Sequence, residues 1–135
     1  MKSRFRLAAT VALVAAAVAG CGKDRGNVSG KVTFNGQPVS EGEVQFYDRE
    51  YGAFFTAKLG ADGTFAARTA EGPGLWIGTY RVAIVPARED PPIGSTAPPK
   101  PKPTVIPPKY WDPKTSDLKV EVDNSSKSFD FELTP

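Results

Sequence analysis

The chain has 135 residues, which is enough for one domain. Its net charge of +2 is misleading, because three of its 17 basic residues lie in the first six positions, and the chain from Cys21 onward carries 14 basic and 15 acidic side chains. Such a near-neutral balance excludes a general electrostatic attraction to nucleic acid. The chain contains no histidine, which excludes Ser-His-Asp and Cys-His catalysis and removes a main ligand of zinc sites.

The start of the chain has the order of charged and apolar residues that is typical of a secretory signal. Residues 1–6 are cationic, and residues 7–19 are almost wholly apolar. As a helix, the apolar run would reach about 20 Å. That length is short of the roughly 30 Å hydrocarbon core of a bilayer. We therefore expect residues 1–20 to be a signal peptide that is removed.

The apolar run ends at Val18-Ala19-Gly20-Cys21, which contains the only cysteine of the chain. A disulfide within the chain is therefore excluded. The four residues resemble the lipobox of bacterial lipoproteins, although that family most often has Leu at the position of Val18. The resemblance implies that Cys21 receives a diacylglycerol and, after cleavage, a further acyl chain such as palmitate. The alternative is a buried cysteine in a hydrophobic helix.

The lipoprotein resemblance also predicts where the protein lies. Two or more acyl chains anchor a protein stably in a bilayer, so membrane lipid would be a partner through Cys21. The protein would be exported and held on the cell membrane or the outer membrane, facing the periplasm or the cell surface. We assign residues 21–27 as the lipidated cysteine and a short tether, whose last six residues span at most about 20 Å. The domain is expected to lie close to the lipid.

From Val28 onward, apolar and polar residues alternate with a period of two, as in half-buried strands of antiparallel sheets. No segment after residue 20 shows a sustained helical period. Residues 53–59 are ambiguous, because Phe54 and Phe55 point to opposite faces. The pattern predicts an all-β domain with strands in the segments 27–34, 43–47, 53–59, 78–86, 117–123 and 128–133.

Turn sequences separate these segments. Asn35-Gly36 and Asp62-Gly63 tolerate the positive φ angles that tight hairpins require, and residues 123–127 form a third polar turn. Six or seven short strands at this spacing do not hide their apolar faces in a single sheet. Two sheets packed face to face, as in a β-sandwich, solve that problem.

The order of these elements resembles the carboxypeptidase regulatory-like domain. Its pattern is matched by Gly30 and Val32, by Gly36 and Pro38, by 62–65 and by 78–82. The resemblance covers residues 28–134 and implies a seven-stranded, transthyretin-like (prealbumin-like) or Ig-like antiparallel β-sandwich. Enzymes of transthyretin-like fold rely on histidines that this chain lacks, so the resemblance implies no activity.

A proline-rich loop at residues 86–108 interrupts the alternation. Proline fixes φ and lacks an N–H donor, so we expect an extended, partly polyproline-II excursion outside the sheets. Pro98 to Pro101 contain a P-x-x-P spacing that aromatic grooves bind, and Lys100, Lys102 and Lys109 could contact anionic lipid or wall polymer. A solvated loop without a partner is nevertheless the favoured interpretation.

Acidic residues give little indication of catalysis or metal binding. Glu41 and Glu43 are close in sequence, and carboxylate pairs support acid–base chemistry, but their position favours a solvated surface. Asp62 and Asp123 lie in turns and lack the density of oxygen ligands that calcium prefers. We therefore predict no catalytic residues, no metal and no cofactor.

Aromatic residues in loops and at strand ends are the remaining candidates for ligand contact. Packing in the core or at its edge is the favoured interpretation for these rings. Exposed rings can stack on sugars or on peptide partners, however, and we select Trp76, Tyr110 and Trp111 as candidate contacts on that alternative interpretation. The aromatic residues considered are Tyr47, Tyr51, Trp76, Tyr110 and Trp111.

Taken together, the sequence favours a membrane-anchored lipoprotein of the cell envelope. Its β-sandwich would be a non-catalytic binding or scaffolding module with a polysaccharide or an envelope protein as ligand. One alternative is a structural subunit or docking module of a larger envelope complex that uses the proline-rich loop. An enzyme relying on carboxylates and tyrosines is the least favoured interpretation.

Overall fold

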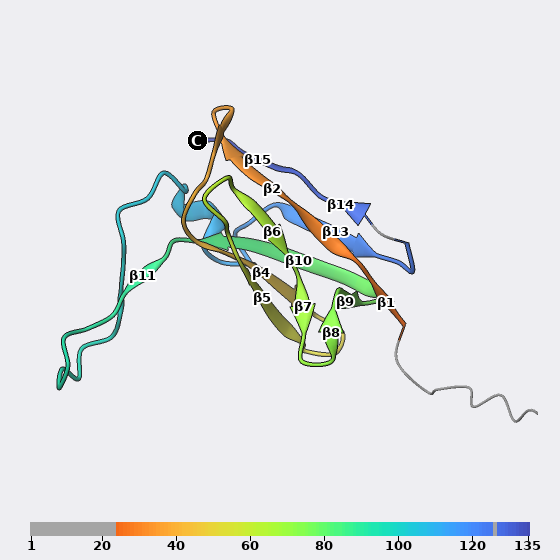
Figure 1. Cartoon of the computed structure of the whole chain (residues 1–135), viewed down its shortest axis with the longest axis horizontal. Helices are drawn as coiled ribbons and strands as arrows, with labels where there is room; N and C mark the ends of the chain where they lie inside the picture. The colour runs from red at the N-terminus through yellow and green to blue at the C-terminus, as the bar shows by residue number, and fades with distance from the viewer. Residues whose placement is uncertain (1–23, 126) are drawn as a thin grey trace, which may run out of the picture.

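The computed structural model describes residues 24–125 and 127–135, so Cys21 and the expected signal peptide lie outside the described residues. Strands dominate this part of the chain (Figure 1). Its one helical element is a short 3-10 helix, η1 (Pro108–Tyr110). The all-β class predicted from the sequence is confirmed.

One main sheet has four strands in the order β13-β10-β4-β5, all antiparallel. Alternate side chains of β4 and β10 face inward, as the period-two pattern predicts, and Val44, Phe46, Tyr80 and Val82 are fully buried. The strand β5 lies at the edge of the sheet. The bounds are β4 (Glu43–Asp48), β5 (Phe54–Lys58), β10 (Gly78–Val85) and β13 (Leu118–Val122).

The second sheet is centred on β2, which pairs with strands from both ends of the described chain. Its partners β3 and β6 are antiparallel, whereas β14 and β15 run parallel to β2. The sequence pattern predicted antiparallel pairing throughout, and the parallel C-terminal strands correct that prediction. The bounds are β2 (Val28–Phe34), β3 (Gln37–Pro38), β6 (Thr64–Ala66), β14 (Lys127–Ser128) and β15 (Phe131–Leu133).

Two residues show how local sequence permits these pairings. Asn35 (φ 49°) and Gly36 (φ 78°) form the tight turn between β2 and β3, as expected for a hairpin with positive φ at both central positions. A Cβ atom on Gly30 would lie 1.8 Å from the carbonyl oxygen of Phe129. A glycine is therefore required where the C-terminal segment approaches β2.

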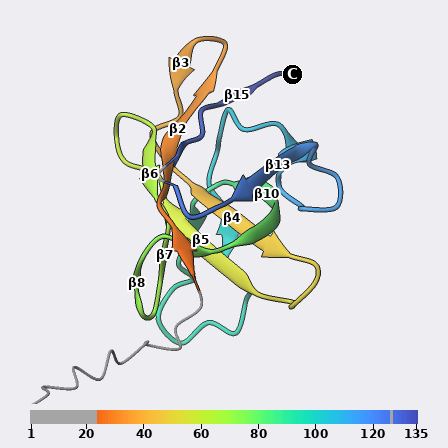
Figure 2. The ribbon, with the colours of Figure 1, turned by 90° about the vertical axis from the view of Figure 1, so that its right-hand side faces the viewer.

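A single core lies between the two sheets. Rings from both sheets meet in it: Phe46 of β4 contacts Phe65 of β6 with centroids 6.0 Å apart, and Phe65 stacks on Phe131 of β15 at 5.9 Å. Figure 2, turned by 90°, shows β2 and β6 to one side of β10 and β13. Face-to-face burial of two sheets is therefore present, as the number of short amphipathic strands predicted.

Three short two-stranded ladders lie outside the two main sheets. The strand β1 pairs with β9, β7 with β8, and β11 with β12, all antiparallel. The first of these corrects the predicted tether of residues 21–27, because Arg25 and Gly26 pair with Trp76 and Leu75. The bounds are β1 (Arg25–Gly26), β7 (Arg68–Thr69), β8 (Gly72–Pro73), β9 (Leu75–Trp76), β11 (Arg88–Glu89) and β12 (Lys100–Pro101).

We name residues 86–108 the arm. It was expected to lie outside any sheet, yet β11 and β12 form a two-residue ladder in which Arg88 is opposite Pro101. The ladder lies outside the two main sheets. Pro101, which lacks an N–H donor, therefore removes no hydrogen bond from a central strand. At the end of the arm, Ile106 is 2% exposed and belongs to the core, whereas Ile93 near its tip is fully exposed.

The framework has two distinct ends (Figure 1). At one end, the described chain begins at Asp24 beside β1 and β9, next to the loop 49–53 that joins β4 to β5; we name this the Asp24 end. The arm leaves the opposite end, after β10 stops at Val85, and we name this the arm end. The two candidate regions described below lie at these two ends.

Candidate functional site

The structure places Trp76 at the Asp24 end, where it lines a small hollow together with Asp24, Asp48, Tyr51 and Ile77. Its ring packs edge-on against Phe55, with the centroids 5.4 Å apart and the planes at 85°. Trp76 is only partly exposed. The two interpretations considered from the sequence, core packing and ligand contact, therefore both apply in part. It packs on the core and still borders open surface.

The loop 49–53 is fixed by a buried carboxylate. Asp48 is 5% exposed and accepts hydrogen bonds from the backbone N–H groups of Glu50 (2.8 Å) and Tyr51 (3.3 Å). The neighbouring Tyr80 hydroxyl donates to the carbonyl oxygen of Trp76 at 2.9 Å. Burial, together with the charge of Asp48, raises the pKa of Tyr80 to about 12, so this hydroxyl remains a neutral donor at neutral pH.

The other two aromatic candidates lie at the arm end. Tyr110 is 2% exposed, and its hydroxyl accepts a hydrogen bond from the backbone N–H of Thr134 at 3.1 Å. Tyr110 is therefore a core residue that closes the C-terminal strand, as the packing interpretation predicted, and the alternative of ligand contact does not apply to its ring. Trp111 is partly buried against the core and donates from Nε1 to the carbonyl oxygen of Ile106 at 3.0 Å.

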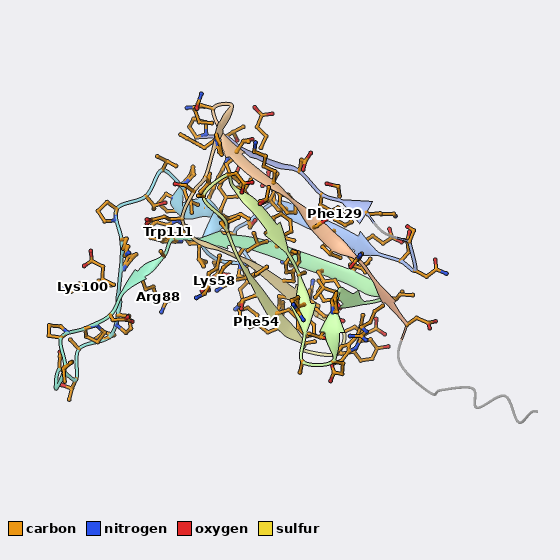
Figure 3. All side chains as sticks on the ribbon, viewed as in Figure 1. Phe54, Lys58, Arg88, Lys100, Trp111 and Phe129 are labelled. Carbon is orange, nitrogen blue, oxygen red and sulfur yellow. The ribbon has the colours of Figure 1, made fainter. Side chains whose placement is uncertain are left out.

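The fold thus does not bring the three predicted contact residues together. Trp76 is adjacent to the start of β10, while Tyr110 and Trp111 follow the arm at the opposite end. Figure 3 shows Trp111 at the base of the arm. A single aromatic ligand site built from Trp76, Tyr110 and Trp111 is not formed.

A groove of about 730 Å³ runs along the edge strand β5 to the base of the arm. One wall is formed by outward-facing side chains of β4 and β5, and the other by the chain as it leaves β10. Figure 3 shows Phe54 and Lys58 on β5, with Arg88 on the arm. The groove is lined chiefly by Glu41, Glu43, Gln45, Phe54, Thr56, Lys58, Val85, Pro86, Ala87, Arg88 and Asp90.

The chemistry of the groove is polar and mixed in sign. Three carboxylates, from Glu41, Glu43 and Asp90, alternate with the cations of Lys58 and Arg88. Hydroxyl and amide groups add neutral donors and acceptors. At the end nearest to Asp24, the ring of Phe54 is 52% exposed. The groove therefore offers many hydrogen-bonding groups and one apolar ring face.

Sequence reasoning missed Phe54, Lys58 and Arg88 as functional candidates. Two adjacent phenylalanines left the direction of Phe54 open, and only pairing with β4 shows that Phe55 faces the core and Phe54 the outer surface. Glu41 and Glu43 were interpreted as solvated carboxylates, and both border the groove. The site could have been predicted from the outer face of residues 54–58, where Thr56 and Lys58 are polar.

Neither a metal cluster nor a membrane-spanning helix was found in the described part of the chain. Across residues 24–125 and 127–135, there is no group of three or more His, Cys, Asp or Glu side chains placed to hold a metal ion. No helix within the same ranges is long and apolar enough to cross a membrane.

Comparisons with known proteins assign the chain to no family. No family model matches it, and no curated protein matches it. Among solved structures, a DUF3823 family protein from Parabacteroides merdae is similar, with a TM-score of 0.49 and 19% sequence identity. The match covers 84% of this chain and 48% of that chain, so this chain spans about half the length of that protein.

Proposed function

We propose that the protein is an exported lipoprotein, anchored through acylated Cys21 on the cell membrane or the outer membrane. The lipobox-like sequence and the preceding apolar run support the attachment. The place where the chain joins the fold supports a short tether: Gly22, Lys23 and Asp24 alone separate Cys21 from β1. Four Cα–Cα steps span at most about 14 Å, so lipid on Cys21 would hold the Asp24 end beside the membrane.

We further propose that the two sheets form a transthyretin-like sandwich of the carboxypeptidase regulatory-like kind. The support is the agreement between the sequence motifs and the observed elements. Gly36 and Pro38 lie in the β2–β3 hairpin, residues 62–65 form the turn into β6, and residues 78–82 begin β10. The parallel pairing of β15 with β2 is the feature to compare with that family.

The anchored domain is proposed to be a non-catalytic module that binds an envelope polysaccharide in the groove along β5. The observation that carries this proposal is the combination of mixed polar groups with the exposed Phe54 ring in one groove. Sugars present hydroxyl groups that pair with carboxylates, amides and ammonium groups, and an apolar face that stacks on aromatic rings. A mixed-charge lining suits a neutral or weakly charged glycan better than a polyanion.

The anchor is tested by the substitution Cys21→Ser. We expect the variant to remain an unprocessed precursor that incorporates no labelled fatty acid, because it lacks the sulfur that receives the lipid. Labelling in growing cells and intact mass spectrometry of the purified protein measure both effects. Continued labelling of Cys21→Ser would refute attachment at this residue.

The groove is tested with the full-length protein in detergent and purified envelope polysaccharides. Phe54→Ala is expected to weaken retention roughly tenfold, which corresponds to about 1.4 kcal/mol. Tyr47→Ala is the matched control, since Tyr47 is an exposed aromatic residue opposite Phe54 that does not line the groove. Unchanged retention in Phe54→Ala, with loss in Trp76→Ala or Trp111→Ala, would place sugar contact elsewhere.

A second candidate function is docking of an envelope protein through the arm. The exposed Ile93 and Val105, together with the stiffening β11–β12 ladder, favour it. The test replaces residues 90–99 with a short Gly-Asn turn that joins β11 to β12 and leaves the buried Ile106 in place. Loss of a cross-linked envelope partner would support docking, and equal recovery with and without residues 90–99 would count against it.

A further inference from the structure

We propose that the Asp24 end is a membrane-contacting surface, on which Tyr51, Trp76 and Ile77 rest at the headgroup level of a lipid bilayer. We name these three residues the Asp24 patch. The inference rests on the proposed lipid attachment at Cys21 and extends it, because it assigns an orientation to the whole domain. The arm and the C-terminal strand end would face away from the membrane.

The first argument is the distribution of exposed apolar side chains over the described residues. Large hydrophobic residues with high exposure lie in only two places. Ile93 and Val105 belong to the arm, and the others lie in the loop 49–53 or at the strand ends beside it. The latter are Tyr47 at 36%, Tyr51 at 69%, Phe54 at 52% and Ile77 at 42% exposed. A concentration of exposed apolar side chains at one end marks an interaction surface.

The second argument identifies lipid as the occupant. The N–H of Ile77 donates to the carbonyl oxygen of Asp24 at 3.0 Å, and Trp76 is opposite Arg25 in the β1–β9 ladder. The patch is therefore adjacent to the segment that leads to Cys21. Because Cys21 lies at most about 14 Å from Arg25 along the chain, an acylated Cys21 would keep the patch next to the headgroups, where a bilayer is the first apolar surface available.

The third argument is the chemistry and rigidity of the patch. Tyr and Trp combine an apolar ring with a polar group and are enriched at membrane–water interfaces. Asp48 fixes the backbone of the loop that carries Tyr51, and Phe55 packs against the Trp76 ring, so the loop backbone and the indole need little further ordering. A pre-ordered surface binds with a smaller entropic cost than a flexible one.

The charges around the patch predict which lipids it prefers. Asp24, Asp48 and Glu50 are offset by Arg25 and Arg49, so the surface has no positive excess that would attract anionic headgroups. The contact should therefore be governed by apolar insertion at the interface. We expect it on zwitterionic phosphatidylcholine vesicles, with little dependence on salt or on the fraction of anionic lipid.

The chain supplies its own spectroscopic probes, because it contains two tryptophans and the structure places them at opposite ends. The acylated full-length protein is reconstituted into phosphatidylcholine vesicles whose acyl chains carry bromine, which quenches nearby indole fluorescence. Trp111→Phe leaves Trp76 as the reporter, and Trp76→Phe leaves Trp111. We expect bromine to lower the Trp76 emission, because Trp rings at a membrane interface lie near the acyl chains, and the Trp111 emission to stay unchanged.

Substitution within the patch provides the matched control. Tyr51→Ser and Ile77→Ser, combined in the Trp111→Phe background, should abolish quenching of Trp76 while the protein still floats with the vesicles through its lipid. Both side chains are exposed, so far-UV circular dichroism, compared with the Trp111→Phe parent, should report an unchanged fold. Persistence of quenching in this variant would overturn the role of the patch.

The remaining outcomes separate the two proposals. Protein that does not float and carries no added lipid mass would refute the anchor at Cys21. Protein that floats through its lipid while Trp76 is not quenched would refute only the bilayer contact. Quenching that appears only with anionic lipid at low salt would overturn the apolar contact and indicate an electrostatic one.

Discussion

The two ends of the domain are closed by similar hydrogen bonds in different surroundings. At the Asp24 end, the hydroxyl of Tyr80 donates to the carbonyl oxygen of Trp76, and at the arm end Nε1 of Trp111 donates to that of Ile106. Tyr80 is fully buried beside the carboxylate of Asp48, whereas Trp111 is partly exposed. The comparison teaches that the Asp24 end is a rigid support for aromatic side chains. The arm end, in contrast, fixes only the base of the proline-rich arm.

The largest effect is expected in the core that both ends share. Phe131 of β15 is 7% exposed and stacks on Phe65, so Phe131→Ala should lower the free energy of unfolding by about 3–5 kcal/mol, as for other buried aromatic residues. Denaturant titration followed by circular dichroism measures it. A loss below about 1 kcal/mol would show that β15 contributes little to the core that unites the ends.

A smaller effect should distinguish the two closing hydrogen bonds. Tyr80→Phe removes the hydroxyl of a fully buried side chain and leaves the carbonyl oxygen of the partly exposed Trp76 without this donor, which should cost about 1 kcal/mol. Trp111→Phe should cost less, because water can reach the partly exposed arm end. The costs should add in the double variant, since the sites are far apart. Equal costs, or strong non-additivity in denaturant titrations, would contradict the proposed difference between the ends.

Replacing the arm tip should hardly change stability. Residues 90–99 are largely exposed, so substituting them with a Gly-Asn turn should alter the free energy of unfolding by no more than about 0.5 kcal/mol. Ile106→Ala is the control from the same arm: its side chain is buried, and its loss should cost about 2–4 kcal/mol. A large loss of stability on replacing residues 90–99 would show that the arm tip contributes to the rigid part of the domain.

The smallest effect concerns the turn after β13, near the Asp24 end. Hydrogen bonds from Lys127 and Ser125, together with the charge of Lys127, hold the pKa of Asp123 well below its usual range. A carboxylate with a lowered pKa stabilises the fold above its unfolded pKa, and this contribution is lost as the pH falls through the folded pKa. Asp123→Asn should therefore lower the melting temperature slightly at pH 7, and the difference from wild type should shrink in strong acid. A difference that grows in acid would contradict this sign.

The sequence predicted those features that depend on local patterns. Alternation located β2, β4, β10, β13 and β15, and Asn35-Gly36 located the first hairpin. Strand direction was not predictable, because a period of two is the same in parallel and antiparallel pairs. The strand β1 was missed because two residues carry no period, and its pairing with Trp76 depends on a segment about fifty residues away in sequence.

The candidate site was less predictable than the fold for the same physical reason. Packing was the favoured interpretation for Tyr110, but this residue follows a proline-rich segment without periodic neighbours, so its hydrogen bond with the distant Thr134 was not predictable. The groove combines outer-face residues such as Phe54 and Lys58 with Arg88 on the arm. Only tertiary structure brings side chains from such separate segments to one surface.

The parallel pairing of β14 and β15 with β2 has a kinetic consequence. A chain synthesised amino end first delivers β2 early, yet the strands that complete its sheet follow about a hundred residues later. Stable closure of the domain therefore waits for nearly the whole polypeptide, and folding should be slow for its size because the decisive contacts are non-local. In the export proposed above, this connectivity would keep the precursor unfolded, and so competent for translocation, until its last strand is available.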